Sequence, residues 1–171
     1  MKILVAIAPE RYRDEELDEP LAVFRENEIS WDIASTRKGT CTGMLGGRAE
    51  ATLSFSDVMP DAYDALVIIG GVGSKVHLWG NRDLAGLATV FAAKKKPVAA
   101  ICLSPVVLAR TGILKGRKAT VFRSPDAVAE VKQGGAALTG LPVVTDGTVI
   151  TADGPDAASA FGRAVVSQLI R

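Results

Sequence analysis

Short apolar runs alternate along the chain with longer amphipathic segments. The apolar runs predict strands at residues 2–8, 31–35, 65–69, 97–101 and 118–122. Three of these runs are apolar almost throughout, which is typical of parallel strands covered by helices on both faces. Strands of this kind indicate a buried central sheet.

The amphipathic segments repeat apolar positions at helical spacing. They predict helices at residues 16–27, 84–94 and 156–170. Pro20 lies in the first of these segments, where it would either kink the helix or mark its true first turn.

Two further segments indicate β structure. Residues 40–55 contain several glycines and predict short, irregular strands. The stretch VVTDGTVIT places Asp146 and Gly147 between two β-rich runs, which is a strong hairpin signal. The alternation of strands and helices predicts one α/β domain over residues 1–171, with a mostly parallel, doubly wound sheet and a small β-hairpin.

Composition and charge exclude several classes of protein. The chain has 171 residues, 48% of them hydrophobic and 23% charged, with a formal net charge of +1. Such a charge creates no field that would collect nucleic acid or anionic lipid. The apolar N-terminal run is too short for a signal peptide, and no stretch approaches the ~20 apolar residues of a membrane helix. We therefore expect a cytoplasmic protein that binds neither nucleic acid nor membrane.

The chain offers few groups for metal or disulfide chemistry. It contains two cysteines, Cys41 and Cys102, and one histidine, His77. We expect both thiols to be reduced, and we expect neither a metal site nor a cofactor. His77 and the neighbouring Trp79 indicate a surface or an interface, although His77 remains a possible base.

Cys102 stands out because it follows an apolar run and precedes a Ser-Pro step, where a buried strand would end and a helix would begin. It could be a small core residue, but a thiol at the start of a helix is favoured as thiolate by the helix dipole. Gly70 and Gly71 end a neighbouring predicted strand and could turn their amides outward. Those amides, with the N–H of Leu103, would form an oxyanion hole beside Cys102. Cys41 gives no such signal.

Several motifs together resemble the ThiJ/PfpI superfamily, which has the class I glutamine amidotransferase-like fold. They are MKIL, EEL…P, DALVIIGGVGS, KPVAAIC-x-x-P, TGILKGRKAT and VITADGP. The resemblance runs almost end to end and implies a flavodoxin-like sandwich, a homodimer or higher homo-oligomer, and a nucleophile-elbow cysteine, Cys102. It also implies that Glu16, four residues before Pro20, hydrogen-bonds that thiol, with the Gly71 and Leu103 amides facing it. Because an ionised glutamate would oppose a thiolate, we expect Glu16 to be protonated and to donate to the sulfur.

The sequence departs from this superfamily at its customary histidines. PfpI-type members carry histidine directly after the cysteine, where this chain has Leu103. Deglycase-like members use a histidine about twenty residues later, where this chain has Phe122 and Arg123. Their late Ser-Arg-Gly-Pro is replaced by the segment 152–155.

Three functions remain open. The favoured interpretation is a cysteine-dependent enzyme acting on a small reactive carbonyl, of the glyoxalase or deglycase kind, or hydrolysing a related small substrate. The first alternative is a non-catalytic redox or stress sensor that uses the same thiol. The second is an intracellular cysteine peptidase, which is disfavoured because Leu103 replaces the histidine that such a reaction needs.

Overall fold

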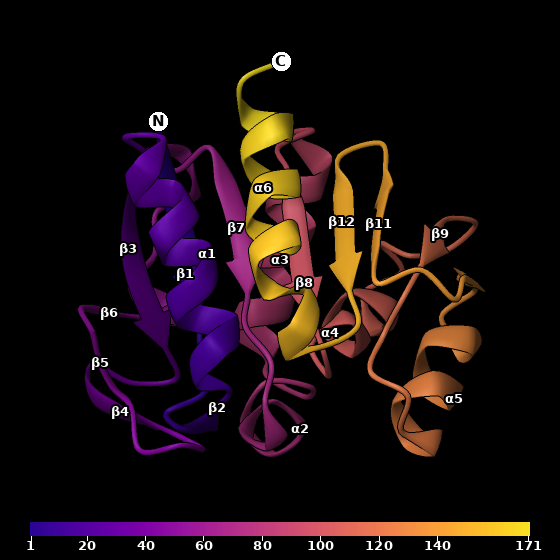
Figure 1. The fold of residues 1–171 in the computed structure, drawn as a ribbon, viewed down its shortest axis with the longest axis horizontal. Coiled ribbons are helices and arrows are strands. Elements are labelled where there is room, and N and C mark those ends of the chain that lie inside the picture. Colours follow the sequence, from indigo (N-terminus) through magenta and orange to yellow (C-terminus); the bar gives the residue numbers. More distant parts are fainter.

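The computed structural model describes residues 1–171 as an α/β fold around a seven-stranded sheet (Figure 1). Its strands follow the order β11-β12-β8-β7-β1-β3-β6. Their bounds are β1 Lys2–Ala6, β3 Ser30–Ser35, β6 Leu53–Ser54, β7 Ala65–Ile68, β8 Val98–Ile101, β11 Val143–Asp146 and β12 Val149–Ala152. All neighbours are parallel except the β11–β12 pair. The predicted parallel sheet and the predicted hairpin are both confirmed.

Helices cover both faces of this sheet. They are α1 Asp14–Glu26, α2 Val72–His77, α3 Arg82–Ala93, α4 Pro105–Arg110, α5 Pro125–Gln133 and α6 Ala158–Leu169. Figure 1 shows α1 and α6 in front of the sheet. The connections β1–α1–β3 and β7–α3–β8 run in opposite directions across it, so right-handed crossovers place α3 on the other face.

Two small sheets and three single turns of 3-10 helix complete the chain. The sheets contain β2 Glu10–Tyr12, β4 Gly39–Gly43 and β5 Arg48–Ala51, and separately β9 Lys118–Ala119 and β10 Ala137–Leu138. The 3-10 turns are Phe55–Asp57, Pro60–Ala62 and Pro155–Ala157. The short strands β4, β5 and β6 confirm the prediction for residues 40–55.

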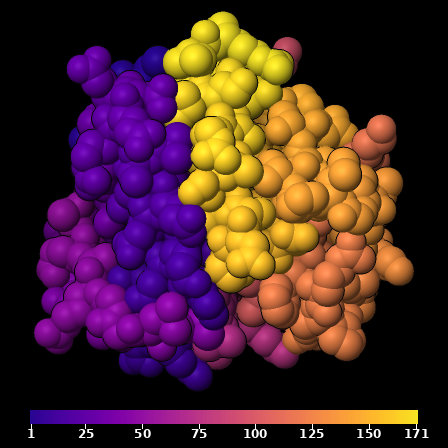
Figure 2. All heavy atoms as spheres, viewed as in Figure 1, coloured from indigo at the N-terminus to yellow at the C-terminus, as the bar shows by residue number.

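The apolar runs form the core. Every residue of β7, β8 and β12 is buried, as expected for strands covered on both sides. In the space-filling view, the C-terminal segment lies directly beside the N-terminal segment (Figure 2). None of the helices combines the length and the apolar character needed to cross a membrane.

Pro20 does not mark the first turn of its helix, so that alternative is wrong. Helix α1 begins at Asp14, and Pro20 lies in its interior. A side chain at Gly162 of α6 would come within 2.9 Å of the Pro20 Cα. Helices α1 and α6 can therefore approach closely at Pro20 because α6 presents no side chain there.

The strand predicted over residues 118–122 is largely wrong. Only Lys118–Ala119 is extended, and it pairs with β10 outside the main sheet. The edge beside β12 is already occupied by β11. The Thr120 amide donates instead to Thr151 Oγ1 at 3.0 Å, and the Phe122 amide donates to the Cys102 carbonyl at 2.8 Å.

Candidate active site

Three chain segments meet at the carboxyl ends of β1, β7 and β8. Strand β1 lies between β7 and β3, so the direction of chain winding reverses beside it. Ligands of doubly wound sheets bind outside the strand ends at such a reversal. The segments that reach this place carry Glu16, the Gly70-Gly71 pair and Cys102.

Cys102 occupies a strained turn directly after β8. Its φ is +65°, a left-handed conformation that costs a non-glycine residue ~1–3 kcal/mol. The turn is held from both sides, because the Cys102 amide donates to the Ala152 carbonyl at 2.8 Å and its carbonyl accepts from Phe122. The backbone thus turns the side chain out of the strand direction while leaving it only 6% exposed.

Buried hydrogen bonds fix the residues that follow. Ser104 Oγ donates to the Ile69 carbonyl at 2.6 Å, and Ser74 Oγ lies 2.7 Å from Ser104 Oγ. Trp79 Nε1 donates to the Leu103 carbonyl at 2.8 Å. These contacts tie the turn after β8 to the end of β7 and to α2.

The glycine pair after β7 fits only without side chains. The φ of Gly71 is +102°, and a Cβ there would lie 2.4 Å from the Arg13 amide nitrogen. A Cβ at Gly70 would lie 2.5 Å from Glu16 Oε1 and 2.6 Å from Cys102 Cβ. This close approach lets the amides of the turn reach the side chains of the site.

Glu16 is completely buried and lies against the thiol. Its Oε1 accepts a hydrogen bond from the Gly70 amide at 3.0 Å, whereas Oε2 has no well-aligned partner. Burial raises the pKa of Glu16 to about 8, and hydrogen bonding with Cys102 and Gly70 acts in the opposite direction. The carboxyl is therefore mainly protonated at neutral pH, as expected. A proton on Oε2 gives that buried atom a hydrogen bond to donate.

The thiol does not have the large thiolate fraction that its sequence position suggests. Burial raises the pKa of Cys102 well above its usual range, and the Glu16 carboxyl raises it further. The amides of Gly71 and Leu103 both hydrogen-bond the sulfur and lower its pKa, but they do not offset burial. Helix α4 has only six residues and begins at Pro105, beyond the Cys102 turn, so its dipole contributes little.

These groups line one small pocket of about 110 Å³. Its lining residues are Arg13, Glu16, Met44, Gly71, Val72, Cys102, Leu103, Phe122 and Pro155. The structure thus brings together Cys102, Glu16, Gly71 and Leu103, which the sequence and the family resemblance predicted to form a site. The rest of the wall is apolar except for Arg13.

Arg13, Met44, Val72 and Pro155 were missed from sequence. Arg13 stands at the start of an acidic run and looks like part of a solvated helix face. Met44 reaches the pocket because the Asp14 carboxylate accepts hydrogen bonds of 2.7 Å from the amides of Leu45 and Gly47 and so holds the intervening loop. The local sequence gives no sign that Arg13 or Met44 lines the pocket.

Other candidate residues lie outside this pocket. His77 is partly exposed at the end of α2 and does not line the pocket, so the structure does not place it as a base for Cys102. Trp79 is 7% exposed, so the expectation that it lies open at an interface is wrong. Cys41 is a fully buried free thiol on β4.

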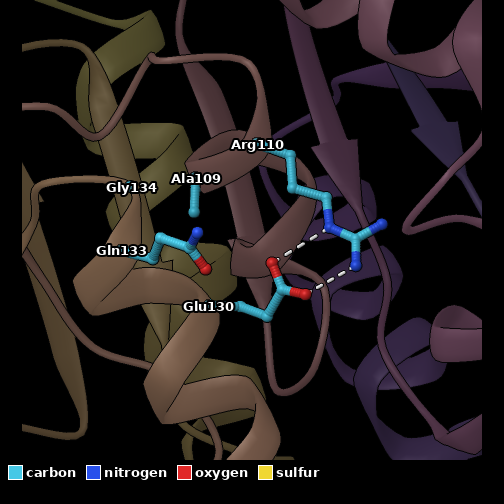
Figure 3. Close-up of a pocket in the computed structure, with 5 residues that line it drawn as sticks. All are labelled: Ala109, Arg110, Glu130, Gln133 and Gly134. Carbon is cyan, nitrogen blue, oxygen red and sulfur yellow. Dashed lines mark hydrogen bonds and ion pairs between the residues drawn. The ribbon is translucent and has the colours of Figure 1, made fainter.

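A wider hollow of about 410 Å³ lies between α4 and α5 (Figure 3). It is lined by Ala109, Arg110, Glu130, Gln133 and Gly134. Figure 3 shows the Arg110 guanidinium paired with the Glu130 carboxylate, with contacts of 3.0 and 2.6 Å. Its one strong donor and its one carboxylate satisfy each other, and no nucleophile points into it. The chemistry therefore belongs to the Cys102 pocket.

The chain is similar to known proteins along almost its whole length. A model of the DJ-1/PfpI family matches residues 1–168. The Methanocaldococcus jannaschii protein MJ0967 is 52% identical over 168 residues, covering 98% of this chain and 82% of its own. Deglycase PH1704 of Pyrococcus horikoshii is 34% identical over 170 residues, covering 99% of each chain.

A solved structure extends this likeness to three dimensions. The ThiJ/PfpI domain protein from Brachyspira murdochii superposes with a TM-score of 0.93 at 34% identity, covering 99% of this chain and 96% of that one. Its sheet and helices therefore follow the same course as those described above. The chain belongs to the DJ-1/PfpI family.

Proposed function

We propose that the chain is a Cys102-dependent enzyme that acts on a small reactive carbonyl, in the manner of a glyoxalase or deglycase. The observation that carries this proposal is the contact between the Cys102 thiol and the Glu16 carboxyl in one small pocket. Several archaeal relatives, among them PH1704, are named deglycases. The small volume suits a molecule of a few heavy atoms.

The arrangement suits addition of a thiol to a carbonyl. The ionised fraction of Glu16 takes the thiol proton as Sγ bonds to the carbonyl carbon. The amides of Gly71 and Leu103 then donate to the oxygen that becomes negative. Return of the proton from Glu16 to that oxygen completes a hemithioacetal. A buried base compensates for a thiol whose own pKa is high.

Two other functions are less well supported. A redox sensor uses the same thiol without turnover, and the apolar side chains of Leu103 and Phe122 in the pocket favour it because they supply no second base. A peptidase needs an acid for the leaving amine, and no histidine lines the pocket.

The test compares wild type, Cys102→Ala and Cys41→Ala on methylglyoxal, simple aldehydes and a fluorogenic peptide. We expect lactate formation from methylglyoxal that falls at least 100-fold in Cys102→Ala and is unchanged in Cys41→Ala, the matched buried thiol. Peptide cleavage that depends on Cys102 would favour the peptidase. Absence of any turnover, with reversible oxidation of Cys102 by peroxide, would favour the sensor.

A further inference from the structure

Arg13 is the one basic side chain that lines the Cys102 pocket. Its Nε lies 3.0 and 3.2 Å from the two carboxylate oxygens of Glu15, and its Nη2 lies 2.8 Å from Glu15 Oε2. This paired geometry fixes the plane of the guanidinium. Nη1 has no hydrogen-bond partner within the chain, so the fixed group still has N–H donors to offer.

The backbone of Arg13 belongs to the same site. Its amide donates to the Gly70 carbonyl at 3.1 Å, directly beside the turn that faces the thiol. The guanidinium also lies within electrostatic range of both reacting groups, because its charge lowers the pKa of Glu16 and it interacts with the Cys102 thiolate. Arg13 is thus anchored at its backbone and at its side chain.

The Glu15 pair limits what Arg13 can bind. A free guanidinium in a small pocket would attract any carboxylate, but here Glu15 already balances its charge. What remains is a set of oriented N–H donors within an apolar wall. Such a group selects a neutral oxygen acceptor, or an oxygen that becomes negative only during the reaction.

We propose that Arg13 is a catalytic and specificity-determining residue for 1,2-dicarbonyl compounds. Nη1 donates to the ketone oxygen of a 2-oxoaldehyde whose aldehyde carbon is bonded to Cys102, and Glu15 is the positioning residue that orients Nη1. This inference rests on the function proposed above and assigns to Arg13 the recognition of the second oxygen beside the reacting carbon.

An internal redox reaction converts the hemithioacetal into a thioester. In the hemithioacetal, the Glu16 carboxylate removes the proton from C1, and the electron pair moves onto the C2 oxygen as an enediolate. Arg13 stabilises that negative oxygen until it takes the proton of the C1 hydroxyl, and Glu16 then returns the first proton to C2 as the C1 oxygen becomes a carbonyl. C1 is thereby oxidised to a thioester while C2 is reduced to an alcohol. Water hydrolyses the thioester and releases a 2-hydroxy acid and the free thiol. No external oxidant or reductant takes part.

A monoaldehyde provides the contrast. It can add to Cys102, but it has no C2 oxygen for Arg13 and no ketone to accept the electron pair. Its reaction stops at the hemithioacetal and gains nothing from Arg13. The preference for a 2-oxoaldehyde over a monoaldehyde should therefore depend on Arg13.

The test uses Arg13→Met, Arg13→Lys and Glu15→Gln, with Arg123→Met as the matched control. Arg123 lines a second, separate pocket that shares Phe122 and Pro155 with the Cys102 pocket, and its Nη2 contacts the Thr139 carbonyl. Arg123→Met therefore removes the same charge from nearby without touching the Cys102 pocket. Hemithioacetal formation is measured as protection of Cys102 from iodoacetamide by methylglyoxal and by propionaldehyde. Short reaction times and intact mass exclude direct modification of arginine by methylglyoxal.

We expect Arg13→Met to lower the methylglyoxal-to-propionaldehyde affinity ratio about tenfold and to lower kcat on methylglyoxal about 100-fold. Glu15→Gln should lower the affinity ratio and kcat by less than Arg13→Met does. Arg13→Lys should retain part of the activity that Arg13→Met loses. Arg123→Met should match wild type. An unchanged affinity ratio in Arg13→Met overturns the inference, whether or not the protein turns over. Loss of all turnover in wild type, with the ratio still dependent on Arg13, overturns only the proposed function.

Discussion

Trp79 Nε1 donates a 2.8 Å hydrogen bond to the Leu103 carbonyl, in a buried contact between the loop after α2 and the turn that carries Cys102. Both backbone groups of Leu103 are thus used, since its amide, which lies in the preceding peptide unit, hydrogen-bonds the Cys102 sulfur. Trp79 therefore holds in place the residue whose amide would stabilise the oxyanion.

Trp79→Phe tests this support. The phenyl ring preserves most of the apolar packing but leaves the Leu103 carbonyl without a donor, so we expect a loss of about 1–3 kcal/mol in the free energy of unfolding. Urea denaturation measures it. Trp31→Phe is the matched control, because Trp31 is only half-buried and its indole makes no hydrogen bond. Equal losses in the two variants would contradict the assigned role.

The same tryptophan shows where sequence reasoning ends. Trp79 follows a histidine and a leucine in a short polar segment, and nothing local reveals that its N–H meets a carbonyl 24 residues away. The central strands were predicted well because parallel strands covered on both faces must be apolar throughout. Helix α2 was missed because six residues are too few for a helical period to emerge, and α5 was missed because only two of its nine residues are buried.

The site was predictable in part for a similar reason. Cys102 and the glycine pair follow apolar runs, so the sheet itself brings them together. Glu16 came only from a resemblance, since six acidic residues crowd the same segment. The pKa of Cys102 was misjudged because burial depends on residues such as Met44 and Phe122, which reach the pocket from distant loops.

Glu16 makes stability depend on pH. Its folded pKa of about 8 lies above the ordinary value of 4.5, so the stability it contributes is full below pH 4.5 and is lost as pH rises through about 8. One pKa unit corresponds to ~1.4 kcal/mol, so the loss is on the order of 5 kcal/mol. Urea unfolding at pH 5, 7 and 9 should show this decline in wild type and a much flatter profile in Glu16→Gln. Parallel profiles would show that Glu16 keeps an ordinary pKa.

Gly71 is needed for its backbone conformation. Gly71→Ala places a Cβ 2.4 Å from the Arg13 amide nitrogen at a φ of +102°, so we expect a loss of at least 2 kcal/mol in stability and a severe loss of Cys102-dependent activity. Gly86→Ala is the contrasting variant, since Gly86 lies inside α3 and its Cβ would meet no atom within 4 Å. That change should stabilise the protein by up to about 1 kcal/mol. Thermal denaturation measures the stability of both variants, and lactate assays measure their activity. Intact activity in Gly71→Ala would remove the amide of this turn from the mechanism.

Assembly remains to be tested, and we propose a homodimer or a higher homo-oligomer. Trp79 is buried and cannot contribute to such an interface, but exposed apolar side chains do gather at the mouth of the pocket. Met44, Val72 and Phe122 line it while remaining 36%, 42% and 43% exposed, and Val76 lies one helical turn beyond Val72 and is 64% exposed. A patch of this kind is typical of an interface between subunits.

Light scattering over a range of concentrations should give a mass of at least twice 17.9 kDa. Val76→Lys should shift the equilibrium toward monomer without lowering the unfolding midpoint of that monomer, because the side chain is largely exposed within one chain. Val90→Lys is the control, since Val90 is also exposed but lies on α3, away from the pocket lining. A constant mass of 17.9 kDa at every concentration would reject the dimer, and equal effects of both lysines would place its interface elsewhere.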